Sequence, residues 1–225
     1  MNSYIFDGSS IQNRRKTNMD CLLIKEKKLN KRKICLAVVC DGVGSLNDGA
    51  FASSRTVHML GEWFDTITDI SRIGIRLRDK VIDIDKCISW EATQMNLQTG
   101  TTISAILIDG ESYYIVHAGD SRIYCAEEEG LKRLTYDQVE NGKLTSCLGH
   151  GVRADLFYNE GQCHNKRFLL CSDGLYKKAD ERFLTEMFLS VDRKTCKKIL
   201  SNLMQHAIYN GETDNISAAI VICES

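Results

Sequence analysis

An apolar run that ends in an aspartate most constrains how this chain can fold. Residues 36–40 read Leu-Ala-Val-Val-Cys without a charge, which is typical of a strand buried on both faces. Asp41 follows directly, in a turn that contains Gly42 and Gly44. Glycine lets the backbone bend sharply and bring a carbonyl close to a ligand. Because a charge at the end of a buried strand is costly when unpaired, we expect Asp41 to have a cationic partner.

The same arrangement of an apolar run and an aspartate recurs. Asp120 follows residues 113–119, Asp173 follows residues 168–172, and Asp214 precedes residues 216–223. Such strand ends tend to share one rim of a sheet, where neighbouring carboxylates repel by about 4 kcal/mol per pair at an effective dielectric constant near 20. Divalent cations relieve this repulsion, and oxygen ligands without a nearby His or Cys cluster favour magnesium or manganese. One such aspartate alone is equally typical of an ordinary hairpin turn.

Six short motifs carry a family resemblance. In chain order they are Arg15-x-x-Asn18-x-Asp20, Asp41-Gly42-x-Gly44, Gly100-Thr101-Thr102, Gly119-Asp120-Ser121-Arg122, Ser172-Asp173-Gly174 and Asp214-Asn215. Their order and approximate spacing resemble the metal-dependent (PPM, type 2C) serine/threonine protein phosphatases of the bacterial type. Each motif alone is a weak signal, but six in the correct order, from about residue 13 to residue 222, form a specific one.

The expected fold follows from the element pattern and is sharpened by the resemblance. Buried strands alternate with amphipathic helices, which predicts a layered α+β domain, and the length suits a single domain over residues 1–225. The resemblance implies a four-layer α-β-β-α sandwich of two antiparallel sheets flanked by helices, with a metal site between the sheets. The expected helices span residues 50–64, 73–88, 180–189 and 193–209, and Asp48 is a candidate N-cap of the first.

The resemblance also implies a dinuclear manganese or magnesium centre. Asp41 would bridge the two ions, the Gly42 carbonyl would bind one of them, and Asp173 and Asp214 would complete the first shell. A metal-bound hydroxide would then be the nucleophile, which fits a sequence that offers no convincing nucleophilic triad. Asp20 would act on the second ion, through water.

Two further roles are implied by the resemblance. Asp120, together with Asp173, would sit by a weaker third ion. Arg15 would hold the substrate phosphate, for which a planar guanidinium is well suited. Arg14 is one residue away in register and is the alternative to Arg15.

The chain departs from the family pattern in three places. Met19 stands where relatives often have Glu or Gln, and a thioether is a poor ligand for a hard cation, so the second ion is expected to bind more weakly. Val43 replaces a histidine that many animal and plant members carry. Residues 135–149 are shorter than the usual segment, which includes a mobile flap, so substrate selection is expected to differ.

Composition limits the cellular setting and the partners. The net charge is −1 with 26% charged residues, which argues against a nucleic-acid binder. No apolar run approaches the roughly 18 residues of a membrane span, and no signal-peptide pattern opens the chain. Ten cysteines without metal-binding spacing predict free thiols in the cytoplasm. The basic run 25–33 is interpreted as a solvated hairpin tip, with an acidic partner as the alternative.

The leading hypothesis is therefore a monomeric, cytoplasmic phosphatase that acts on phosphoserine and phosphothreonine in proteins and opposes a Ser/Thr kinase. The first alternative is a catalytically weak, phosphatase-like module that binds phosphoproteins without turnover. The intact Asp41, Asp173 and Asp214 argue against this alternative, whereas Met19 and the short flap favour it. A small-molecule phosphatase is the second alternative.

Overall fold

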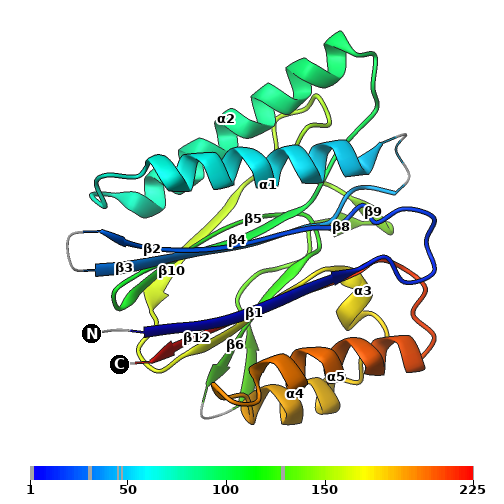
Figure 1. Ribbon diagram of the computed structural model, residues 1–225. Helices are drawn as coiled ribbons and strands as arrows, with labels where there is room; N and C mark the ends of the chain where they lie inside the picture. The colour runs from blue at the N-terminus through cyan, green and yellow to red at the C-terminus, as the bar shows by residue number, and fades with distance from the viewer. Residues whose placement is uncertain (1–2, 30–31, 45, 47, 128–129, 225) are drawn as a thin grey trace.

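Two five-stranded antiparallel sheets pack face to face, and helices cover the outer face of each (Figure 1). The computed structural model describes residues 3–29, 32–44, 46, 48–127 and 130–224. The first sheet has the order β1 (Ser3–Ile11), β12 (Ile216–Glu224), β11 (Arg167–Cys171), β6 (Arg122–Glu127), β7 (Gly130–Arg133). The second has the order β10 (Phe157–Gln162), β5 (Ser112–Ala118), β4 (Ile103–Asp109), β3 (Arg32–Cys40), β2 (Cys21–Leu29).

The helices complete the four layers. Helices α1 (Gly49–Thr66) and α2 (Ile73–Gln94) pack on the second sheet, and α4 (Glu181–Leu189) and α5 (Cys196–Tyr209) pack on the first. A single turn, α3 (Asp173–Tyr176), follows β11. The predicted α-β-β-α sandwich is confirmed. None of the described helices combines the length and the hydropathy needed to cross a membrane.

The burial of β3 explains its unbroken apolar sequence. Ala37 and Val39 pack into the core between the two sheets, whereas Leu36, Val38 and Cys40 pack into the core beneath α1 and α2. Because both faces of this strand are covered, no position on it favours a polar side chain. Strand β3 thus runs through the middle of the molecule and places Asp41 at the end of the sandwich.

The predicted helices are present, but two of their boundaries are shifted. Helix α2 continues to Gln94 instead of ending at residue 88. Asp48 caps α1 as predicted, because its side chain accepts a hydrogen bond from the Phe51 N–H at 3.0 Å. Helix α5 begins at Cys196 instead of residue 193. The Asp192 carboxylate accepts hydrogen bonds from the backbone N–H groups of Lys194 and Thr195, both at 2.8 Å. This local turn delays the start of the helix.

Residues 25–33 belong to a hairpin as predicted, but residues 25–29 and 32–33 lie on its paired strands and not at its tip. Strands β2 and β3 run through most of this segment, and residues 30–31 lie outside the described part of the chain. The Lys27 ammonium donates to the Asp65 carbonyl at 2.9 Å and to the Ile67 carbonyl at 2.6 Å, at the C-terminal end of α1, where cations are favoured. Lys33 pairs with Glu26 at 3.2 Å. These basic side chains therefore have partners within the chain.

The short segment over residues 135–149 forms a small hairpin. Its strands are β8 (Val139–Glu140) and β9 (Lys143–Leu144), which pair with each other. Asn141 and Gly142 form the turn with φ values of 51° and 75°, the left-handed region that a tight two-residue hairpin turn requires. Gly142 and Leu144 line the cavity described next.

Candidate active site

A cavity of about 560 Å³ lies at the end of the sandwich where four strand-end aspartates meet. They are Asp41 after β3, Asp120 after β5, Asp173 after β11, and Asp214 before β12. Sequence positions as far apart as 41 and 214 come together because the strands that carry them run antiparallel in two packed sheets. The chain thus gathers four carboxylates, and the backbone of Gly42 and Gly44, around one space.

The Gly100-Thr101-Thr102 motif fixes the backbone of Asp41. The Thr102 N–H donates to the Asp41 carbonyl at 2.8 Å, and the Asp41 N–H donates to the Thr102 hydroxyl at 3.0 Å. The Thr101 hydroxyl also donates to the Asp41 carbonyl, at 3.0 Å. The hydroxyls of Thr102 and Ser121 are also hydrogen-bonded to each other, at 2.7 Å. This bond connects the turn to the segment that follows Asp120. No role for these threonines was predicted from the sequence.

The turn after Asp41 is closely packed. The Gly42 N–H donates to the Met19 carbonyl at 3.2 Å. A Cβ on Gly42 would lie 2.6 Å from the carbonyl carbon and oxygen of Gly49 and 2.8 Å from the Met19 oxygen. Glycine is therefore required here by the approach of two other backbone segments, and this approach brings the N-terminus of α1 up to the cavity.

Burial and neighbouring carboxylates raise the pKa of two aspartates that line the cavity, Asp41 and Asp120. Burial, followed by the charges of Asp20, Asp173 and Asp120, raises the pKa of Asp41 well above its ordinary value. Burial and the charge of Asp173 raise the pKa of Asp120 to about 6, against the opposing effect of Lys177. The aspartates therefore hold an excess of negative charge that additional cations would stabilise.

Asp20 is close to this cluster but is absent from the described residues that line the cavity. It is only 5% exposed, and its carboxylate accepts a hydrogen bond from the Ser172 hydroxyl at 2.8 Å. Burial raises the pKa of Asp20 to about 6, although the hydroxyls of Ser217 and Ser172 act in the opposite direction. This placement is compatible with the expected indirect role, in which water lies between Asp20 and an ion.

Two cationic side chains pair with the aspartates of the cavity. Arg15 forms a bidentate pair with Asp214, with Nε–Oδ1 and Nη2–Oδ2 distances of 2.8 and 2.6 Å. Lys177 forms an ion pair with Asp173. Arg15 lines the cavity, and Arg14 is not among its described lining residues, so the geometry favours Arg15 of the two candidates. Lys177 was missed, although its spacing of four residues from Asp173 is a signal of contact within a helical turn.

Asn215 anchors the loop that carries Arg15. Its side-chain NH₂ group donates to the carbonyls of Gln12 and Thr17 at 2.9 and 3.0 Å, and its side-chain oxygen accepts from the Met19 N–H at 2.9 Å. The Asp214-Asn215 motif thus holds the N-terminal loop with Arg15 in place. A conformational role for Asn215 could not be predicted from the spacing alone.

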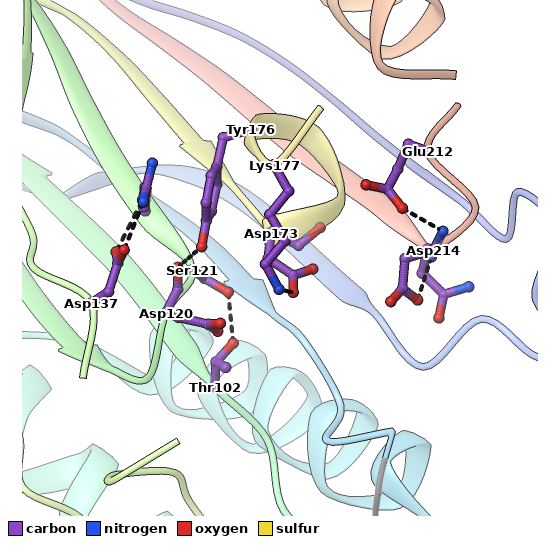
Figure 2. A network of polar contacts seen from close by, with 12 residues as sticks. Thr102, Asp120, Ser121, Asp137, Asp173, Tyr176, Lys177, Glu212 and Asp214 are labelled. Atoms are coloured by element: carbon purple, nitrogen blue, oxygen red, sulfur yellow. Dashed lines mark hydrogen bonds and ion pairs between the residues drawn. The ribbon is translucent and has the colours of Figure 1, made fainter. Parts of the chain in front are cut away.

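Arg122 and Tyr176 support the segment that presents Asp120. The Arg122 guanidinium lies 3.5 Å from the centre of the Tyr176 ring and pairs with Asp137 at 2.6 Å. The Tyr176 hydroxyl in turn donates to the Asp120 carbonyl at 2.9 Å (Figure 2). The arginine of the Gly-Asp-Ser-Arg motif is therefore a positioning residue, because it acts on Asp120 through Tyr176.

The donor chemistry of the cavity fits a hard divalent cation. Its candidate ligands are all oxygens, as magnesium and manganese prefer. Burial, followed by repulsion from other carboxylates, raises the pKa of Asp41 and Asp120. Across the described residues, however, no three Asp, Glu, His or Cys side chains are already arranged to hold a metal ion. Asp214 and Asp173 are instead engaged by Arg15 and Lys177. The predicted ligand roles therefore stay predictions.

Solved structures share this architecture. A bacterial serine phosphatase superposes with a TM-score of 0.87 at 21% identity, covering 96% of both chains. A serine/threonine phosphatase from Staphylococcus aureus gives a TM-score of 0.85 at 22% identity, covering all of this chain and 96% of that one. At these identities the likeness establishes the fold.

The family is established by sequence. Residues 8–207 match the model of the protein phosphatase 2C family, and the chain belongs to that family. A relative named serine/threonine phosphatase stp from Listeria innocua is 25% identical over 85% of this chain and 86% of its own length. The protein PstP of Mycobacterium tuberculosis is 28% identical over 82% of this chain and 40% of its own length. The predicted family and the predicted class of enzyme, a protein phosphatase, are confirmed.

Proposed function

We propose that this chain hydrolyses phosphoserine and phosphothreonine in proteins, at a centre of two manganese or magnesium ions, and so opposes a Ser/Thr kinase. The observation that carries the proposal is the gathering of four aspartates around one cavity, where Arg15 and Lys177 are the only paired cations among the described lining residues. Relatives named serine/threonine phosphatases support the choice of substrate. Free cysteines at all ten positions are in keeping with a reducing compartment.

The proposed ligands are the Asp41, Asp173 and Asp214 carboxylates and the Gly42 carbonyl, with Asp20 acting through water. Bound divalent cations would supply a water that loses its proton near neutral pH and positive charge for the phosphoryl oxygens. The chain itself holds Asp41 in place through Thr102 and places the Arg15 guanidinium in the lining of the cavity. A cation on Asp214 would compete with Arg15 for the same oxygens, which would leave the guanidinium free to bind a phosphate.

Arg15→Ala is expected to raise the KM for a phosphothreonine peptide by about tenfold, with a smaller change in kcat, because a phosphate clamp contributes chiefly to binding. Steady-state kinetics at saturating manganese measure both constants. Arg14→Ala is the matched control, since Arg14 is exposed and is not among the described lining residues. A KM unchanged by Arg15→Ala but raised by Arg14→Ala would assign the clamp to Arg14.

Met19→Glu is expected to lower the manganese concentration that gives half-maximal activity. Met19 lines the cavity, and a carboxylate there would add an oxygen ligand in place of a thioether. The measurement is a manganese titration of the initial rate in both proteins, with Met19→Gln as the uncharged control. An unchanged or higher manganese requirement in Met19→Glu would show that Met19 does not weaken the binding of the second ion.

The proposed activity is tested with a phosphothreonine peptide and with p-nitrophenyl phosphate, each with and without manganese. We expect manganese-dependent turnover of both. Folded protein without any manganese-dependent rate would favour the alternative, a module that binds phosphoproteins without turnover. Turnover of p-nitrophenyl phosphate together with poor turnover of the peptide would favour a small-molecule phosphatase.

A further inference from the structure

Lys177 is placed by the fold to reach a candidate metal ligand. Helix α3 is a single turn that begins at Asp173, and the Lys177 N–H donates to the Asp173 carbonyl at 2.9 Å as the turn ends. Residues four apart in a helical turn lie on the same side. The Lys177 ammonium accordingly pairs with the Asp173 carboxylate, and both residues line the cavity.

The position of this ammonium matters because of the other carboxylates nearby. The charges of Asp173, Asp120 and Asp41 all act on Lys177. Lys177 is also the cation that acts on Asp120. Figure 2 shows Lys177 descending from α3 onto Asp173, with Asp120 on the neighbouring segment. A positive charge therefore already stands beside the two carboxylates, Asp120 and Asp173, that are expected to hold the third ion.

The other cations around the cavity are engaged elsewhere. Arg15 pairs with Asp214, and Arg122 pairs with Asp137. Of the charges with the largest effect on Asp120 among the described residues, that of Lys177 is the positive one, and a third divalent ion would have to displace the ammonium from Asp173. The ammonium is tethered to the turn that carries Asp173, so its effective concentration at this carboxylate is high. A weakly binding ion has to compete with it for Asp173.

We propose that the ammonium of Lys177 takes the place of a third divalent cation beside Asp120 and Asp173, so that this chain binds two ions and not three. The inference rests on the proposed function, since it presupposes the two-ion centre. In this inference Lys177 compensates the negative charge of Asp120 and Asp173, which the family resemblance would assign to a third ion.

The test counts manganese sites by isothermal titration calorimetry on metal-free protein, so that it does not depend on activity. We expect two sites in the wild type and three in Lys177→Met, with the additional site the weakest. Adding Asp120→Asn to Lys177→Met should return the count to two. Lys178→Met is the matched control, because it removes the same charge from the adjacent exposed position and should leave the count at two. The Lys177 side chain is 54% exposed, so the variant is expected to fold.

The outcomes separate this inference from the proposed function. Three sites in the wild type, or two in Lys177→Met, would overturn the role of Lys177 and leave the two-ion centre standing. A Lys177→Met protein with two sites and a raised KM would assign the lysine to substrate binding, and this too overturns the inference. The absence of manganese binding in every variant would overturn the proposed metal centre itself, and the inference with it.

Discussion

Asp41→Asn is expected to lower kcat/KM for a phosphothreonine peptide by about a thousandfold or more, which corresponds to about 4 kcal/mol of transition-state stabilisation. Asp41 is the carboxylate that would contact both ions, and its backbone is fixed by hydrogen bonds to Thr101 and Thr102. An amide in its place keeps the shape and removes the charge. Steady-state kinetics in saturating manganese provide the measurement.

The same substitution should stabilise the metal-free protein. Burial and the neighbouring carboxylates raise the pKa of Asp41, which means that its charged form is unfavourable in the folded state without a cation. Thermal unfolding in EDTA at pH 7 should therefore give a higher Tm for Asp41→Asn than for the wild type. A loss of activity below tenfold would contradict the ligand assignment, and a lower Tm in EDTA would contradict the electrostatic account.

Gly42→Ala is expected to lower the free energy of unfolding by about 3 kcal/mol, and the Tm by roughly 6–12 °C for a chain of this size. The added Cβ would lie 2.6 Å from the Gly49 backbone, and backbone atoms at the start of α1 cannot move aside as a flexible side chain can. The turn would have to shift, and the Gly42 carbonyl with it. Urea denaturation of metal-free protein measures the loss without any contribution from metal binding.

Gly44→Ala is the matched control in the same turn. Gly44 also lines the cavity, but no atom of the described residues outside its chain neighbours lies within 4 Å of the Cβ that an alanine would add. We expect a change in the free energy of unfolding within about 0.5 kcal/mol, as for a surface substitution. Equal destabilisation by the two alanines would show that glycine is needed here for chain flexibility and not for the approach of Gly49.

The framework of the fold could be predicted because its signals are local and strong. The apolar run of β3 and the spacing of Ile73, Leu77 and Val81 in α2 each specify an element before any tertiary contact is considered. Strand β10 (Phe157–Gln162) was missed because its sequence, Phe-Tyr-Asn-Glu-Gly-Gln, has no apolar run. It is a strand because it pairs with β5 at the edge of the second sheet, and such pairing leaves little trace in the sequence.

The site residues likewise fall into those with a local sequence signal and those that only the fold brings together. Asp41 and Asp173 were predicted because an aspartate after a buried run is conspicuous. Lys177 was missed because a lysine in a polar segment carries no such signal, and only the one-turn helix α3 brings it to Asp173. The pairing of Arg15 with Asp214 joins residues 199 positions apart, and no local pattern predicts such a contact.

The central claim is that aspartates from distant segments hold a pair of divalent cations. A crystal grown with manganese, with anomalous diffraction recorded at the manganese absorption edge, tests it most directly. The account predicts two strong peaks in the cavity, both in contact with Asp41, with Arg15 moved off Asp214 and Lys177 still paired with Asp173. A cavity without manganese peaks, with Arg15 still bound to Asp214, would contradict it.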